Sequence, residues 1–134
     1  MKNVEVTFPL LEDITMNVAK RYGMLQPGES ATKAVRAVFF IDPKNIVRAI
    51  IYYPLSLGRN FDEIKRVLIG LQTADNFGIA TPADWRPGDD VIVPPAGSCG
   101  VAKSRMDGEE GMTCYDWYFC TKKISKEDVE SKLG

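Results

Sequence analysis

The sequence predicts an α/β fold, and three consecutive segments carry that prediction. Residues 35–41 are apolar at every position except Arg36, a pattern typical of a central strand that is covered on both faces. Residues 45–53 are β-branched and aromatic and stop before Pro54, as an antiparallel partner strand would. Residues 60–72 have apolar side chains at helical spacing, which predicts the main helix with a stripe of Ile64, Val67, Leu68 and Leu71.

Short polar signals mark the ends of these elements. The sequence Asp-Pro-Lys-Asn at residues 42–45 predicts a type I turn between the two strands. Asn60 is suitable as the helix cap, and Glu63 stands where a capping box has its carboxylate. Alternating apolar residues over Val4–Thr7 predict a further strand near the start of the chain.

The rest of the chain is expected to form a short helix, an extended arm and further short elements. A helix is expected to open at Glu12 or Asp13, with Gly23 ending it. Residues 77–95 contain four prolines and predict an extended arm, in which Trp85 anchors a turn and residues 91–93 form a short strand. Residues 101–106 predict one or two helical turns, and Ser125 predicts the cap of a last short helix.

Composition excludes several classes of function. The 134 residues are 45% hydrophobic and carry a net charge of −1, without a basic run, so a folded domain is expected and nucleic-acid binding is disfavoured. The sequence contains no histidine, which excludes His-dependent triads and Cys/His zinc sites. No apolar run reaches the ~18 residues that a membrane span needs, and the start lacks a signal-peptide core, so we expect a cytoplasmic protein.

Two arginines interrupt the apolar pattern. Arg36 begins the strand that is expected to be covered, where an unpaired guanidinium would cost several kcal/mol. It therefore needs an anion, a carboxylate or a water-filled cleft. Arg59 lies in the loop before the main helix. For both residues an ordinary ion pair remains the alternative to a functional role.

Two of the three cysteines, Cys114 and Cys120, flank an aromatic segment. Within one helix their side chains would lie about 240° apart around the axis, and within one strand roughly 20 Å apart. A direct bond between them would therefore need a looped segment. They are either two buried thiols, or one of them is a thiol that attacks a sulfur elsewhere.

The blocks ATKAVRAVFFIDPKNIVRAIIYYPLSLGRNFDEIKRVLIGLQ and ATPADWRPGD resemble the latter half of a peroxiredoxin of the 1-Cys-like, largely archaeal subgroup. The resemblance to this family of thiol-specific antioxidant and alkyl hydroperoxide reductase proteins runs from FPLLED through CYDWYFC. It implies a truncated thioredoxin-like domain over residues 1–76 and a C-terminal dimerisation arm over residues 77–134. The family's Pro-Xaa-Xaa-Xaa-Thr-Xaa-Xaa-Cys motif, which carries the peroxidatic cysteine, has no counterpart in these residues.

The resemblance also implies residue roles. Arg36 and Arg59 match the two arginines that stabilise the reactive thiolate and the departing oxyanion. Cys120 matches the resolving cysteine best, with Cys114 assisting it or forming an alternative bond, whereas Cys99 has no family role. The implied substrates are a peroxide and a thiol reductant, either thioredoxin-like or a small thiol, and neither a cofactor nor a metal is expected.

The sequence is compatible with three functions. The chain is part of a thiol peroxidase that needs its peroxidatic half, a non-catalytic assembly module, or a thiol switch that uses Cys114 and Cys120. A homo-oligomer, or a complex with the missing half, is expected because the predicted strands and the aromatic segment need a covering surface.

Overall fold

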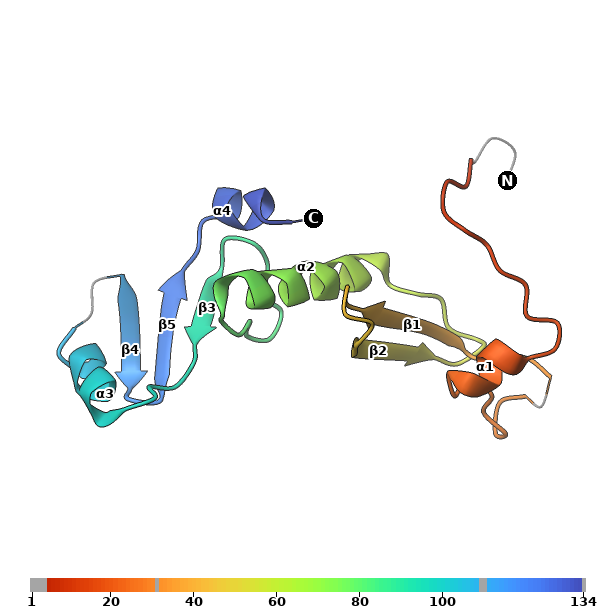
Figure 1. Ribbon diagram of the computed structural model, residues 1–134, viewed down its shortest axis with the longest axis horizontal. Helices are drawn as coiled ribbons and strands as arrows, with labels where there is room; N and C mark the ends of the chain where they lie inside the picture. The colour runs from red at the N-terminus through yellow and green to blue at the C-terminus, as the bar shows by residue number, and fades with distance from the viewer. Residues whose placement is uncertain (1–4, 31, 109–110, 134) are drawn as a thin grey trace. The chain divides into compact units, whose positions relative to one another are not determined.

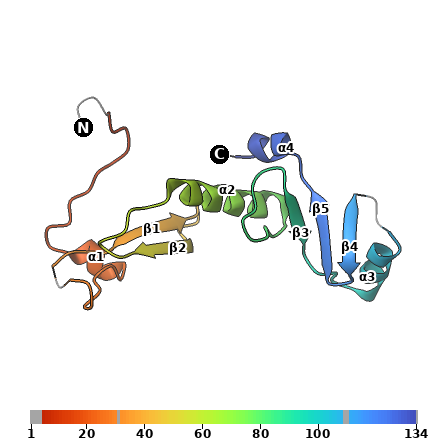
Figure 2. The same cartoon turned by 180° about the vertical axis from the view of Figure 1, so that it is seen from behind.

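A computed structural model describes residues 5–30, 32–108 and 111–133 and contains two compact units, Met1–Arg59 and Asn60–Gly134 (Figures 1 and 2). In the part of the chain that is described, the first unit has a short helix and a two-stranded sheet, and the second has three helices and a three-stranded sheet of order β3-β5-β4. The elements are α1 (Asn17–Arg21), β1 (Arg36–Ile41), β2 (Val47–Tyr53), α2 (Phe61–Phe77), β3 (Asp90–Val93), α3 (Cys99–Met106), β4 (Met112–Asp116), β5 (Phe119–Lys123) and α4 (Lys126–Ser131).

The hairpin of β1 and β2 is antiparallel, as predicted. Its turn closes where the Asn45 amide donates to the Asp42 carbonyl over 2.9 Å. The Asp42 carboxylate also accepts from the amides of Lys44 and Ile46, both at 2.9 Å. The acidic side chain therefore fixes the turn that the sequence Asp-Pro-Lys-Asn predicts.

The prediction that residues 35–41 form a central strand is wrong for this chain. Within the described residues β1 pairs with β2 alone, and Phe40 is the one buried residue along it. The Ile41 side chain at its end is 46% exposed. A run of apolar residues indicates that a strand is buried in its final context, but it does not show which segments cover it. Among the described residues no strand pairs with the second edge of β1.

The expected strand at Val4–Thr7 is also not formed. Residues 5–7 have no regular secondary structure, and Val4 lies outside the described residues. A strand needs a partner for its backbone groups, and none of the described segments pairs with this one. The following helix α1 begins at Asn17, later than predicted, although the Asp13 carboxylate does cap it by accepting from the amides of Val18 and Ala19.

Helix α2 begins where the sequence predicts. Asn60 Oδ1 accepts from the amides of Asp62 and Glu63 at 3.0 and 3.2 Å, so the predicted cap is confirmed. The helix continues past residue 72 to Phe77, and Gly78 ends it in the left-handed conformation with φ of 61°.

The stripe of α2 that packs differs from the predicted one. Ile69, Ala74 and Phe77 lie against the hydrophobic core of the second unit, and Thr73 between them is buried. Leu68, a member of the predicted stripe, is 47% exposed. The other members of the predicted stripe, Ile64, Val67 and Leu71, are half-buried, so Leu68 is its one exposed member.

The core of the second unit is formed by Ile79, Trp85, Val91, Ile124 and Val129. The Trp85 side chain is 1% exposed, and its Nε1 donates to the Asp89 carbonyl over 3.2 Å, which confirms the predicted anchored turn. Ser125 Oγ accepts from the Asp128 amide and caps α4, also as predicted. Among the described residues no helix is long and apolar enough to cross a membrane.

Candidate functional site

Arg36 is the first residue of β1 and lies opposite Tyr53 in the hairpin. Its Nη1 donates a hydrogen bond to the Leu57 carbonyl oxygen over 3.0 Å. Leu57 precedes Arg59 by two residues, so this bond attaches the loop that carries Arg59 to the start of the strand. The side chain of Arg36 is exposed and partnered, which corrects the expectation of a guanidinium in a covered position.

A second contact holds the same loop. The Leu55 amide donates to Glu29 Oε2 over 3.2 Å, and Glu29 belongs to the loop that precedes β1. Arg59 itself is exposed, and its side chain makes no hydrogen bond or ion pair with the described residues. The loop backbone is thus held at two points, while the second predicted arginine faces solvent.

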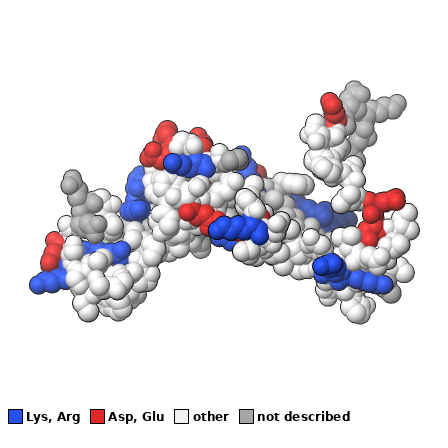
Figure 3. Space-filling view, viewed as in Figure 1, with Lys and Arg blue, Asp and Glu red and all other residues white. Residues whose placement is uncertain are grey.

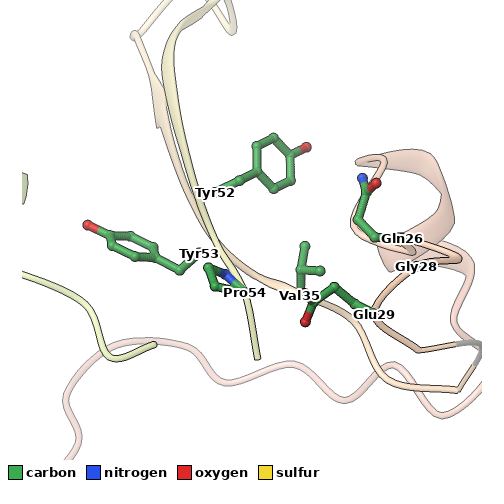
Figure 4. A pocket seen from close by; sticks show the side chains of 7 residues that line it. All are labelled: Gln26, Gly28, Glu29, Val35, Tyr52, Tyr53 and Pro54. Atoms are coloured by element: carbon green, nitrogen blue, oxygen red, sulfur yellow. The ribbon is translucent and has the colours of Figure 1, made fainter. Parts of the chain in front are cut away.

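A cavity of about 570 Å³ lies beside this loop (Figure 4). Figure 4 shows the Tyr52 and Tyr53 rings on opposite sides of β2, as neighbouring strand positions require. The Tyr52 hydroxyl donates to the Tyr22 carbonyl over 2.7 Å, which fixes its ring. The lining residues are Gln26, Gly28, Glu29, Val35, Tyr52, Tyr53 and Pro54.

Sequence reasoning did not single out Glu29. Its carboxylate lies at the cavity and accepts a backbone amide, so it is both a structural tie and a hydrogen-bond acceptor for a bound group. The only signal in the sequence is an acid directly after Pro27 and Gly28, which is too common in loops to indicate a site. The cavity combines this acceptor with two tyrosines and suits a small polar molecule or a side chain.

The two cysteines of the aromatic segment form a disulfide in the β4–β5 hairpin. Cys114 and Cys120 face each other across the two strands, with Cα atoms 4.0 Å apart. The chain reverses between the cysteines at Trp117 and Tyr118, which supplies the looped segment that a direct bond was expected to need. The disulfide replaces the two expected alternatives, a pair of buried thiols or a thiol that attacks a sulfur elsewhere. Cys120 is 1% exposed and Cys114 is half-buried.

The aromatic side chains of this hairpin remain at the surface. The Tyr115 ring stacks on the Phe119 ring with centroids 5.3 Å apart, and Trp117 contacts Tyr118 edge to face at 5.5 Å. Exposed fractions range from 38% for Phe119 to 68% for Tyr115. Cys99 is a free, exposed thiol in the first turn of α3. Within the described residues no cluster of His, Cys, Asp or Glu could hold a metal ion.

Comparison with known proteins relates these features to a family. Residues 1–50 match the sequence model of the AhpC/TSA family, and residues 70–104 match that of the C-terminal domain of 1-Cys peroxiredoxin. A peroxiredoxin of Methanosarcina mazei is 55% identical over 128 residues, which cover 95% of this chain and 58% of that protein. Peroxiredoxin 2 of Caldanaerobacter subterraneus is 52% identical over 90% of this chain and 55% of its own length.

Comparison with solved structures also finds peroxiredoxins. The structure of a yeast mitochondrial 1-Cys peroxiredoxin superposes with a TM-score of 0.67 at 38% identity, over 81% of this chain and 53% of that one. Peroxiredoxin 6 of Arenicola marina gives a TM-score of 0.64 at 35% identity, over 82% and 53%. The chain spans little more than half the length of these relatives. It belongs to the peroxiredoxin family.

Proposed function

We propose that the chain contributes the arginine-bearing part of a thiol peroxidase site. With a segment that carries the peroxidatic cysteine, it would reduce hydrogen peroxide and organic hydroperoxides at the expense of a thiol. The observation that carries this proposal is the hydrogen bond from Arg36 to Leu57, which attaches the loop of Arg59 to the strand of Arg36. The exposed guanidinium groups leave room for a thiolate and a peroxide beside them.

The chemistry assigns a role to each arginine. A peroxidatic thiolate attacks the O–O bond of the peroxide, which gives a sulfenic acid and an alkoxide or hydroxide that takes up a proton. Guanidinium groups stabilise both the attacking thiolate and the departing oxygen, because each is an anion. Arg36 is held for this task by its hydrogen bond to Leu57, and Arg59 would act from the loop that this bond attaches.

The resolving step involves the hairpin cysteines. A resolving thiol attacks the sulfenic sulfur, which forms a disulfide and releases water. Cys120 is bonded to Cys114, so a thiol reductant must first open this disulfide before either cysteine can act. We therefore propose that Cys120 is the resolving thiol and Cys114 the partner that protects it between turnovers.

Complementation tests the proposal. The isolated chain should consume hydrogen peroxide little faster than free cysteine, because it offers no PxxxTxxC segment to make a reactive thiolate. Adding a polypeptide with that segment should give saturable consumption in the presence of dithiothreitol. Fast, saturable consumption by the chain alone would refute the proposal and point to Cys99, Cys114 or Cys120 as the attacking thiol.

A thiol switch without peroxidase turnover is the second candidate, and the disulfide across β4 and β5 favours it. A non-catalytic assembly module is the third, and the exposed aromatic hairpin favours it. A diagonal redox gel distinguishes these two, because a switch cycles between oxidised and reduced forms whereas an assembly module does not need to. Assembly as a homo-oligomer and a cytoplasmic location remain part of the proposal.

A further inference from the structure

A charged cavity of about 380 Å³ lies in the second unit, formed by residues distinct from the arginine loop and the cysteines. Three segments meet there: the first half of α2, the turn after Trp85, and α4. Figure 3 shows basic and acidic side chains side by side over α2 and α4. The lining residues are Asp62, Lys65, Arg66, Ile69, Arg86, Pro87, Lys126 and Glu130.

Cations outnumber carboxylates in this lining. Arg66 is engaged by Glu63, with nitrogen-to-oxygen distances of 2.6 and 2.8 Å, and Lys126 lies 3.7 Å from Glu130. The side chains of Lys65 and Arg86 make no hydrogen bond or ion pair with other described residues. Lys65 and Arg86 are therefore not held in ion pairs, although Asp62 shares the cavity with them and Arg86 also helps to lower the pKa of Glu63.

The backbone holds Arg86 in position. Its amide donates to Asp89 Oδ2 over 2.8 Å, and the Asp89 amide donates back to the Arg86 carbonyl over 2.9 Å. The buried Trp85 ring anchors the same turn through the Asp89 carbonyl. A Cβ atom on Gly88 would lie 3.8 Å from Lys126 Cβ, so the turn packs directly against the start of α4. The free arginine and the lysine of α4 are thus held near each other by rigid elements.

We infer that this cavity binds a phosphate ester. The phosphate would lie between Lys65, Arg86 and Lys126, because a guanidinium matches phosphate oxygens in bidentate geometry and the ammonium groups add point charges. The volume exceeds that of a phosphate group, and Ile69 and Pro87 supply an apolar surface for the organic part. The site goes beyond the peroxidase proposal, since it uses neither Arg36 and Arg59 nor a cysteine.

Titration of the full chain with phenyl phosphate, followed by amide and methyl NMR shifts, tests the inference. Saturable shifts are expected at Arg86, Lys126 and Ile69, with weakening as salt rises. The double variant Lys65→Gln/Arg86→Gln should bind at least tenfold more weakly. The matched control Lys103→Gln/Lys123→Gln removes two cations of the same unit outside the cavity and should bind as the unaltered chain does.

Three results would overturn the inference. Shifts that do not saturate, or an equal loss in both double variants, would show that phenyl phosphate responds only to the general charge of the unit. Inorganic phosphate that binds as tightly as phenyl phosphate would exclude a role for Ile69 and Pro87 and so the ester. Spectra with the dispersion of the unaltered chain establish that each variant is folded, so a loss of binding is read as a loss of the site.

Discussion

Arg36 Nη1 and the carbonyl oxygen of Leu57 are joined by a 3.0 Å hydrogen bond across 21 residues of sequence. The bond uses one of the five N–H groups of the guanidinium and leaves the others available. It also connects the start of β1 to a loop that is tied a second time through Leu55 and Glu29. A single arginine thereby serves as structural support and as a charge for chemistry.

Replacing Arg36 by alanine should therefore affect activity more than folding. In the complemented peroxidase assay, Arg36→Ala should lower kcat/KM by about 100-fold or more, the usual cost of one lost donor to a developing oxyanion. Arg21→Ala removes an exposed arginine of α1 and is the matched control, expected to retain activity. Equal activity of both variants would show that Arg36 acts only on the loop.

The disulfide between Cys114 and Cys120 should stabilise the second unit. Closing so short a loop is worth about 2 kcal/mol in the chain-entropy estimate. Reduction with a phosphine should therefore lower the free energy of unfolding by that amount, measured by urea denaturation with tryptophan fluorescence, since Trp85 and Trp117 both belong to this unit.

Two variants separate the disulfide from general effects of the reductant. Cys99→Ser retains the disulfide and should respond to the phosphine as the unaltered chain does, because Cys99 is a free thiol. Cys114→Ser has no bond to reduce and should not respond. If the phosphine also lowered the stability of Cys114→Ser, the loss could not be assigned to the disulfide between Cys114 and Cys120. In the complemented assay with thioredoxin in place of dithiothreitol, which reduces a sulfenic acid directly, Cys120→Ser should stop turnover after one round of peroxide reduction.

The pair of Glu63 and Arg66 predicts a pH dependence of stability. The hydrogen-bonded Arg66 guanidinium lowers the pKa of Glu63 below its usual 4.5, with a smaller contribution from Arg86. Because this pKa is lower in the folded chain, the stabilisation is complete above pH 4.5 and disappears as the pH falls through the folded-state value. Thermal unfolding should show Glu63→Gln less stable at pH 7 and equal to the unaltered chain in strong acid.

A matched acid elsewhere checks that result. Glu12→Gln removes an exposed carboxylate of the first unit. The difference in thermal stability between pH 7 and strong acid should be the same in this variant as in the unaltered chain. If the stability of Glu63→Gln falls in acid as much as that of the unaltered chain, the pair of Glu63 and Arg66 does not contribute to the pH dependence of stability. Since Glu63 is substantially exposed, the effect should also weaken in high salt.

Local signals were predictable from the sequence, whereas long-range packing was not. The Asp42 turn, the Asn60 and Ser125 caps and the Trp85 turn depend on residues close in sequence, and all four were found. Capping and turn chemistry act within a few residues, so the sequence contains the whole interaction. The predicted role of Glu63 in the capping box is the exception, because its carboxylate pairs with Arg66 instead.

The errors concern what each element packs against. The apolar pattern of residues 35–41 could not show that β1 would have one partner strand among the described residues, and the α2 pattern could not show that Ile69, Ala74 and Phe77 would meet the core of the second unit. The candidate site was predicted in part. Arg36 and the Arg59 loop are joined, but the cysteine spacing could not distinguish a hairpin from a continuous element, since a reversal at Trp117 has no glycine to mark it.

The exposed apolar groups predict that the chain does not remain a free monomer. The described residues expose Phe8, Leu10, Leu11 and Ile14 ahead of α1, and Tyr115, Trp117 and Tyr118 at the β4–β5 hairpin. Contiguous exposed apolar side chains of this kind mark surfaces that bind another surface. Light scattering at micromolar concentration should therefore report a mass above the 14.9 kDa of one chain.

Two double variants test whether the β4–β5 hairpin contributes to this assembly. Tyr115→Ser/Trp117→Ser should shift the mass distribution toward the monomer if the hairpin contributes, whereas Lys103→Gln/Lys123→Gln should not. A compact particle near 14.9 kDa for the unaltered chain would contradict the prediction and with it the assembly function.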